Sequence, residues 1–145
     1  MKKGILMLVL ASLTSVSYAT QPVKNLSDLA RVTCKSTFEG QDTIRVTSTA
    51  AHDKEGYTVA MTLLVDRLIG GSWYKQNFQI TQADYPQSNI LVLHGVNSRG
   101  EPLVLTAPLS DDPVKGDFKY MDSDIRINGQ MQDYLKFLCM VNFAG

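Results

Sequence analysis

Residues 134–143 read YLKFLCMVNF, a stretch that places a cysteine in an alternating apolar segment. Every odd position carries an apolar side chain, so a strand here would present one unbroken apolar face to a protein core. The cysteine of the stretch, Cys139, belongs to that face. We therefore predict a core strand whose thiol points inward. The positions that form the face are Leu135, Phe137, Cys139, Val141 and Phe143.

The second of the two cysteines lies in a similar setting in the first half of the chain. In RVTCKSTF, residues 31–38, Cys34 shares an apolar face with Val32 and Phe38. A reactive thiol requires exposure and a positive neighbourhood, and a metal site requires more ligands of this kind. Two core-facing cysteines in a small secreted domain instead predict a disulfide between Cys34 and Cys139.

Such a disulfide would bring the first and last strands of the domain together. In an up-and-down meander with an even number of strands these two strands are antiparallel, so their adjacency would close the sheet into a barrel. A two-sheet sandwich is the alternative, since a disulfide can also join facing sheets. The cysteines thus favour a closed barrel over a sandwich.

Period-two alternation covers most of the remaining chain in short segments bounded by turn residues. Segments that follow one another through short links pair with their neighbours. The pattern predicts an all-β fold, an antiparallel up-and-down meander of about eight strands. Besides 31–38 and 134–143, the expected strands are residues 43–49, 56–65, 72–81, 89–96, 102–107 and 118–127.

The alternation also predicts which side chains point inward. In GYTVAMTLLV, residues 56–65, the odd positions form the apolar face and include Tyr57 and Val59. His94 is in phase with the apolar Val92, which predicts a hydrogen-bonded core histidine.

The links between the strands are alternately tight and long. Gly, Asn and Asp at the tight links supply the backbone conformations that hairpin reversals need. Alternate links of a meander lie at opposite ends, so the long links would share one end of the molecule. The tight links are at residues 39–42, 70–71, 97–100 and 128–129, and the long ones at 50–56, 83–88 and 108–116.

The end with the long links is the expected binding surface, because long polar loops on a rigid barrel commonly form a binding mouth. The alternative is that these loops are solvated connections without a further role. Trp73, beside a tight link, is an additional candidate as an anchor for a partner, or else packs on a neighbouring loop. The candidate binding residues at the long links are His52, Asp53, Glu55, Tyr85, Asp111, Asp112 and Lys115.

The first residues have the order of a secretory signal. A pair of lysines precedes an apolar run over 5–13, and small residues occupy positions 17 and 19, which a signal peptidase reads. We expect residues 1–19 to be a cleavable signal peptide and residues 20–145 to form a single domain. The expected location is the periplasm or the exterior of a bacterium.

The charge pattern argues against nucleic-acid binding. Lys and Arg number 14, as do Asp and Glu, and the two signs are interleaved along the chain. A nucleic-acid-binding protein would need a basic stripe. No second long apolar segment follows the first, so we also expect no transmembrane helix. A small outer-membrane barrel is an alternative, although its long loops would follow odd-numbered strands rather than even-numbered ones.

Motifs for catalysis and cofactor binding are absent from the sequence. G-x-S-x-G, H-E-x-x-H, C-x-x-C and phosphate-binding glycine loops do not occur. The acidic stretch 122–133 lacks the glycine that a calcium loop requires at its centre. We therefore expect no cofactor and no metal, and we assign no catalytic residue. A hydrolase-like enzyme would have to use His52 with Asp111 or Asp112.

At the level of fold alone, the predicted barrel resembles small secreted barrels such as lipocalin-like carriers and periplasmic lysozyme inhibitors. Fold analogy does not carry function. The first hypothesis is a non-enzymatic binding or inhibitor-type protein that engages a small ligand or a protein partner. The alternatives are the hydrolase-like enzyme and an envelope structural component without a discrete site.

Overall fold

A computed structural model of the chain describes residues 26–109, 120–132 and 136–143, and these residues form ten strands. The predicted signal peptide lies outside the described residues. The strands are β1 (Leu29–Phe38), β2 (Gln41–His52), β3 (Thr58–Ile69), β4 (Ser72–Gln87), β5 (Ile90–Val96), β6 (Pro102–Pro108), β7 (Met121–Asp122), β8 (Asp124–Ile127), β9 (Gln130–Met131) and β10 (Phe137–Phe143).

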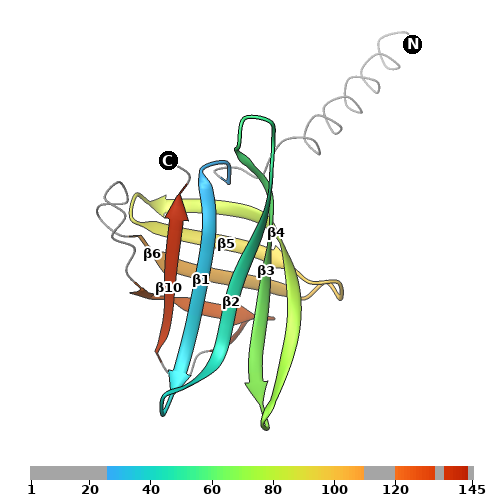
Figure 1. The fold of residues 1–145 in the computed structure, drawn as a ribbon, viewed down its shortest axis with the longest axis vertical. Coiled ribbons are helices and arrows are strands. Elements are labelled where there is room, and N and C mark those ends of the chain that lie inside the picture. Colours follow the sequence, from blue (N-terminus) through green and yellow to red (C-terminus); the bar gives the residue numbers. More distant parts are fainter. Residues whose placement is uncertain (1–25, 110–119, 133–135, 144–145) are drawn as a thin grey trace, which may run out of the picture.

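All these strands belong to one antiparallel sheet, which confirms the all-β prediction. Their order across the sheet is β7-β10-β1-β2-β3-β4-β5-β6-β8-β9, so β1 to β6 form the predicted meander. Figure 1 shows β10, β1, β2 and β3 side by side, with β5 and β6 crossing behind them. The sheet curves into a half-barrel. Within the described ranges, no helix is long and apolar enough to cross a bilayer.

The strand count differs from eight because the segment expected at 118–127 is divided. Its first part is β7, which pairs with β10, and its second part is β8, which pairs with β6. A further short strand, β9, turns back on β8 through Asn128 and Gly129, both with positive φ. One predicted strand thus becomes two, and its hairpin adds a third.

The prediction of a closed barrel is wrong, because the sheet is open. Ser123 separates β7, which is one edge strand of the sheet, from β8, which lies next to the opposite edge strand β9. The N–H of Ser123 donates a hydrogen bond to the carbonyl oxygen of Phe137 at 2.8 Å. Among the described residues, no ladder pairs β10 with β8 or β9. The two edges therefore approach each other at Ser123 without joining.

The predicted disulfide is confirmed. Cys34 on β1 and Cys139 on β10 are direct partners in the ladder, with Cα atoms 4.0 Å apart and side chains that are buried. Both cysteines lie on the inner face, in the core with Val32 and Phe137. The disulfide joins the first and last strands as expected, but it does not close the sheet.

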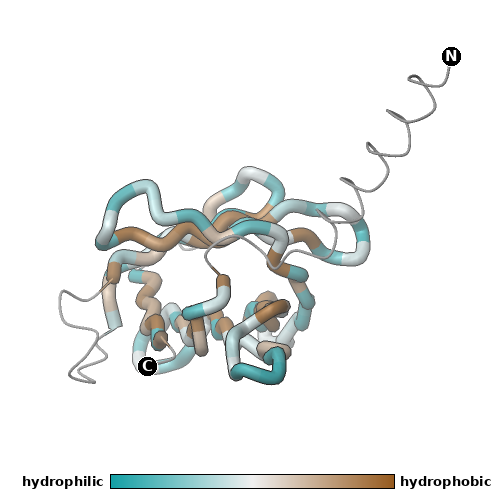
Figure 2. Tube along the Cα trace, turned by 90° about the horizontal axis from the view of Figure 1, so that it is seen from above, coloured by the Kyte–Doolittle hydropathy of each residue, from teal (hydrophilic) through white to brown (hydrophobic). Residues whose placement is uncertain are grey.

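The sheet bends at β4, the longest strand. Residues 72–79 of β4 pair with β3, and residues 79–87 pair with β5. Seen from above, the sheet folds over into two facing halves, with hydrophobic and hydrophilic residues alternating along the chain (Figure 2). Because β4 runs to Gln87, the long link expected at 83–88 is wrong: only Ser88 and Asn89 form the turn to β5.

Two register shifts alter the predicted inner faces. Ala51 pairs with Ala60 and His52 with Thr58, so Val59 is an extra residue on β3, as in a β-bulge. Beyond this shift Thr58 is buried, whereas Val59 is 37% exposed and does not belong to the core. A second shift, after Ser36, accompanies the exposure of Phe38. Period two holds within each ladder and fails where a residue is inserted.

Candidate functional site

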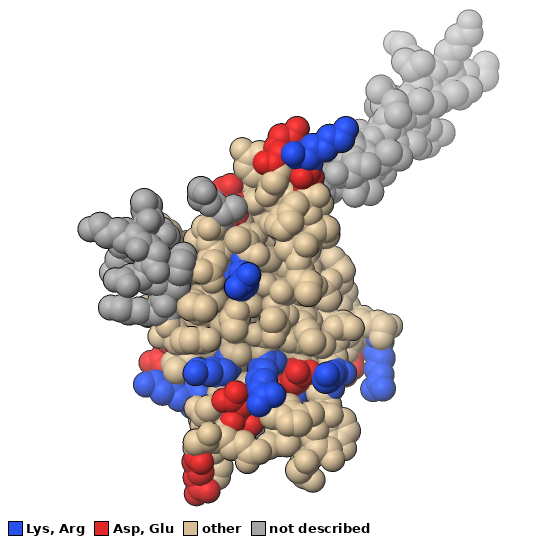
Figure 3. Space-filling view, viewed as in Figure 1, with Lys and Arg blue, Asp and Glu red and all other residues tan. Residues whose placement is uncertain are grey.

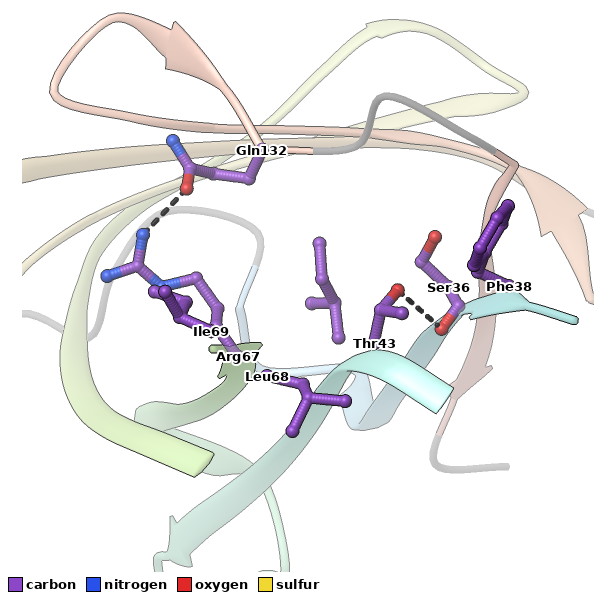
Figure 4. A pocket seen from close by; sticks show the side chains of 8 residues that line it. Ser36, Phe38, Thr43, Arg67, Leu68, Ile69 and Gln132 are labelled. Carbon is purple, nitrogen blue, oxygen red and sulfur yellow. Dashed lines mark hydrogen bonds between the residues drawn. The ribbon is translucent and has the colours of Figure 1, made fainter. Parts of the chain in front are cut away.

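A cavity of about 450 Å³ lies at the end of the molecule that carries the tight β1–β2 and β3–β4 turns. Figure 4 shows side chains from several strands arranged around it. This end is opposite to the one that the long links led us to expect. The lining residues are Ser36 and Phe38 of β1, Thr43 and Ile44 of β2, residues 67–69 of β3, and Gln132, which follows β9.

The walls of the cavity are largely apolar. Ile44 belongs to the core and lines the cavity, whereas Phe38 and Ile69 are half exposed at the hairpin ends. The cavity exists because the inner faces of β1, β2 and β3 continue beyond the packed core toward their turns. Gln132 lies across the hollow from these strands (Figure 4).

Arg67 provides the cationic group of the cavity. It follows Val65 at period two, so it points to the inner face of β3. Its Nη1 donates to Oε1 of Gln132 at 2.6 Å, a contact drawn in Figure 4, and its Nη2 donates to Oε1 of Gln76 at 2.7 Å. Its Nε is buried and has no hydrogen-bond partner among the described residues. Two neutral amides thus hold a guanidinium inside the sheet.

The outer face at the same level carries charges of both signs. Lys35, Arg45, Asp66 and Lys75 are successive direct partners across β1 to β4. Figure 3 shows a belt of charged side chains across the molecule, with largely uncharged surface on either side. Trp73 belongs to this outer face, because the guanidinium of Arg45 lies 4.4 Å from its ring centroid. Its ring therefore contacts a strand residue of β2.

The predicted residues of the β2–β3 link form a compact turn. Asp53 Oδ1 accepts hydrogen bonds from the N–H groups of Glu55 at 3.0 Å and Tyr57 at 2.9 Å. His52 is exposed at the end of β2, and its Nδ1 lies 3.4 Å from Oγ1 of Thr58. The carboxylate of Asp53 therefore shapes the turn, and the link is shorter than expected because β2 extends to His52.

Tyr85 lies within β4 and packs against the core. Its ring centroid is 6.5 Å from that of Phe143 on β10. Burial raises the pKa of the Tyr85 phenol, and the negative charge of Asp28 adds to this effect. Asp111, Asp112 and Lys115 lie outside the described residues. The gathering of the predicted loop residues and the pairing of His52 with either aspartate stay predictions.

His94 is not a core histidine. Leu91, Leu93 and Gly95 form the inner face of β5, so His94 points outward, and its Nε2 lies 3.4 Å from Oδ2 of Asp84. The in-phase residues Ile90 and Val92 share this outer face and are half-buried there.

None of the residues that line the cavity was predicted as a binding residue from the sequence. A signal was present at Arg67, because the inner face of β3 otherwise carries Met61, Leu63 and Val65. A charged residue in phase with a buried apolar face lowers the stability of the fold unless it lies at the end of a strand or belongs to a functional site. Ser36, in phase with Val32 and Cys34, is a second interruption of the same kind.

Within the described ranges, no group of three His, Cys, Asp or Glu side chains is placed to hold a metal ion. Comparisons with protein-family models, curated proteins and solved structures each find no match. The chemistry of the cavity therefore carries the functional argument.

Proposed function

We propose that this protein is a non-enzymatic binding protein that holds a small, largely apolar ligand in the cavity at its tight-turn end. The proposal keeps the class predicted from the sequence, a secreted or periplasmic binding protein, and moves the binding site away from the long links. The observation that carries it is a cavity of about 450 Å³ with apolar walls and one convergent cationic group.

Size and lining support this proposal. Sites for small molecules usually measure roughly 300–1,000 Å³ and combine apolar walls with a few polar groups that fix orientation. The disulfide between β1 and β10 and the ladders of β1, β2 and β3 hold most of the lining on strands rather than on loops. A site built on rigid elements is preformed, which lowers the entropic cost of binding.

A neutral fluorescent probe tests the site. N-phenylnaphthylamine should bind the purified protein with saturable fluorescence enhancement. Ser36 lines the cavity and is only 2% exposed, so Ser36→Leu should fill part of the space and weaken probe binding at least about tenfold. Thermal melting would show that the variant is folded.

The matched control is Ser98→Leu, which adds the same side chain to an exposed turn residue far along the chain from the lining. It should leave probe binding unchanged. Equal binding by the parent protein and a folded Ser36→Leu variant would place the probe elsewhere and contradict the proposal.

A further inference from the structure

We infer that the ligand of this cavity is a carboxylate-bearing amphiphile, whose carboxylate binds Arg67 and whose apolar chain lies along the walls. This inference rests on the proposed function, because it names the chemical class of the ligand in the same cavity.

Arg67 differs from two other arginines of the described chain in its partners. Arg45 is paired with Asp42 and Arg126 with Asp124, each with an N···O distance of 3.1 Å. Among the described residues, Arg67 has no carboxylate within ion-pairing distance, and both of its hydrogen-bond acceptors are amide oxygens. Among the described lining residues, none carries a negative charge that would compensate it.

Some N–H donors of the Arg67 guanidinium have no acceptor among the described residues. Arginine carries five N–H donors. The bonds to Gln132 and Gln76 use one N–H of Nη1 and one of Nη2, and Nε is buried, so the second N–H of each Nη group is left for a ligand. A partly buried charge is costly unless it is paired and hydrogen-bonded, so an incoming anion gains from both effects. Gln76 on β4 and Gln132 after β9 act as positioning residues, since they hold the guanidinium from two sides without neutralising it.

The rest of the lining selects the kind of anion. Arg67 is the one basic side chain among the described lining residues, which suits a single negative charge better than a phosphate dianion. Ile44, Leu68 and Ile69 offer apolar contact beside it, as Figure 4 shows for the labelled Leu68 and Ile69. A carboxylate at the end of an apolar chain satisfies both parts of the cavity.

Two ligands of equal chain length separate the charge from the apolar contact. Decanoate and decanol would each be measured by displacement of N-phenylnaphthylamine from the parent protein and from Arg67→Gln. We expect decanoate to bind the parent protein more tightly than decanol. In Arg67→Gln, decanoate should lose at least about tenfold in affinity, and decanol should change little. Arg99→Gln, at an exposed turn arginine, should bind both ligands as the parent does.

Gln132→Glu provides a second variant in case Arg67→Gln does not fold. A carboxylate beside the guanidinium would occupy it as an internal counterion, so decanoate binding should fall selectively while the contact between β3 and residue 132 is kept. Gln130→Glu is the matched control, because it adds the same charge at an exposed position of β9.

The outcomes separate the two proposals. Selective loss of decanoate in Arg67→Gln or Gln132→Glu supports the inference. Equal displacement by decanoate and decanol, unchanged in both variants, overturns the carboxylate class and leaves the apolar binding site standing. Failure of both compounds to displace the probe from the parent protein overturns both proposals, and displacement by decanol alone overturns the carboxylate class.

Discussion

At the scale of single residues, Thr58 shows how a polar side chain enters the core. The inserted residue Val59 turns Thr58 inward, where it is 0% exposed. Its hydroxyl donates to the carbonyl oxygen of Leu29 at 2.7 Å, and its N–H donates to that of Ser27 at 3.0 Å. Thr58 thus ties the start of β3 to the segment that leads into β1.

Replacement of Thr58 by Val should lower the free energy of unfolding by about 1–3 kcal/mol, because the shape is kept while the buried carbonyl oxygen of Leu29 loses its donor. Urea denaturation would measure the change. Thr47→Val, on the exposed face of β2, should shift the unfolding midpoint very little. An equal shift in both variants would show that the bond to Leu29 adds nothing.

At the scale of elements, β4 joins the two halves of the sheet, and Gly95 on β5 lies opposite its bend. Ile80 pairs with Gly95 and Gln82 with His94, so Thr81 is an extra residue on β4. A Cβ on Gly95 would lie 3.1 Å from the carbonyl oxygen of Gln79 and 3.3 Å from Cδ1 of Ile80. A larger residue at position 95 would therefore require its neighbours on β4 to shift by a few tenths of an ångström.

Gly95→Ala should destabilise the protein by about 1–2 kcal/mol, since the crowded carbonyl of Gln79 belongs to a strand paired on both sides and cannot move aside freely. Gly95→Val should cost more, because it adds two further methyl groups at the same contact. Thermal unfolding of both variants gives the order. A valine variant as stable as the parent protein would refute the close packing at the bend.

At the scale of the whole molecule, the disulfide links residues 105 positions apart and supports a sheet that remains open. A crosslink over such a long loop restricts the unfolded chain strongly. It also holds β10 against β1, and β10 in turn carries β7, the strand at that edge of the sheet.

The double variant Cys34→Ala with Cys139→Ala should lose about 4–5 kcal/mol of unfolding free energy by the chain-entropy argument for a loop of this length. Urea denaturation with and without a reducing agent measures the loss. Reductant should lower the unfolding midpoint of the parent protein and leave that of the double variant unchanged. A parent midpoint insensitive to complete reduction would contradict this prediction.

Much of this fold could be predicted from the alternation of residues in the sequence. The alternation of Val32 and Cys34, and of Phe137 and Cys139, predicted both inner faces and the disulfide, because side chains of a strand alternate strictly between its two sides. The Gly70–Gly71 pair predicted a turn, since glycine readily adopts the positive φ that a tight hairpin needs. Both residues have positive φ in the structure. These features depend on near neighbours in the chain.

The errors share a different origin. The predictions for Val59 and Phe38 were wrong because a register shift depends on the pairing strand. The prediction for His94 was wrong because both faces of β5 carry apolar residues, and the pairing strands decide which face is buried. Tyr85 was placed in a loop because Pro86 and the polar residues around it resemble a turn, whereas β5 extends the ladder to Gln87.

The all-β class, most of the strands, the tight turns and the cysteine pair could be predicted from the residues alone, because these follow from local backbone preferences and period-two burial. The open barrel and the cavity at the tight-turn end became visible with the three-dimensional structure. Both depend on where distant strands stop pairing: β7 and β8 diverge at Ser123, and the inner faces of β1, β2 and β3 extend past the core. There the guanidinium of Arg67 is hydrogen-bonded to Gln76 and Gln132. No sequence pattern predicts that these residues lie beside Arg67.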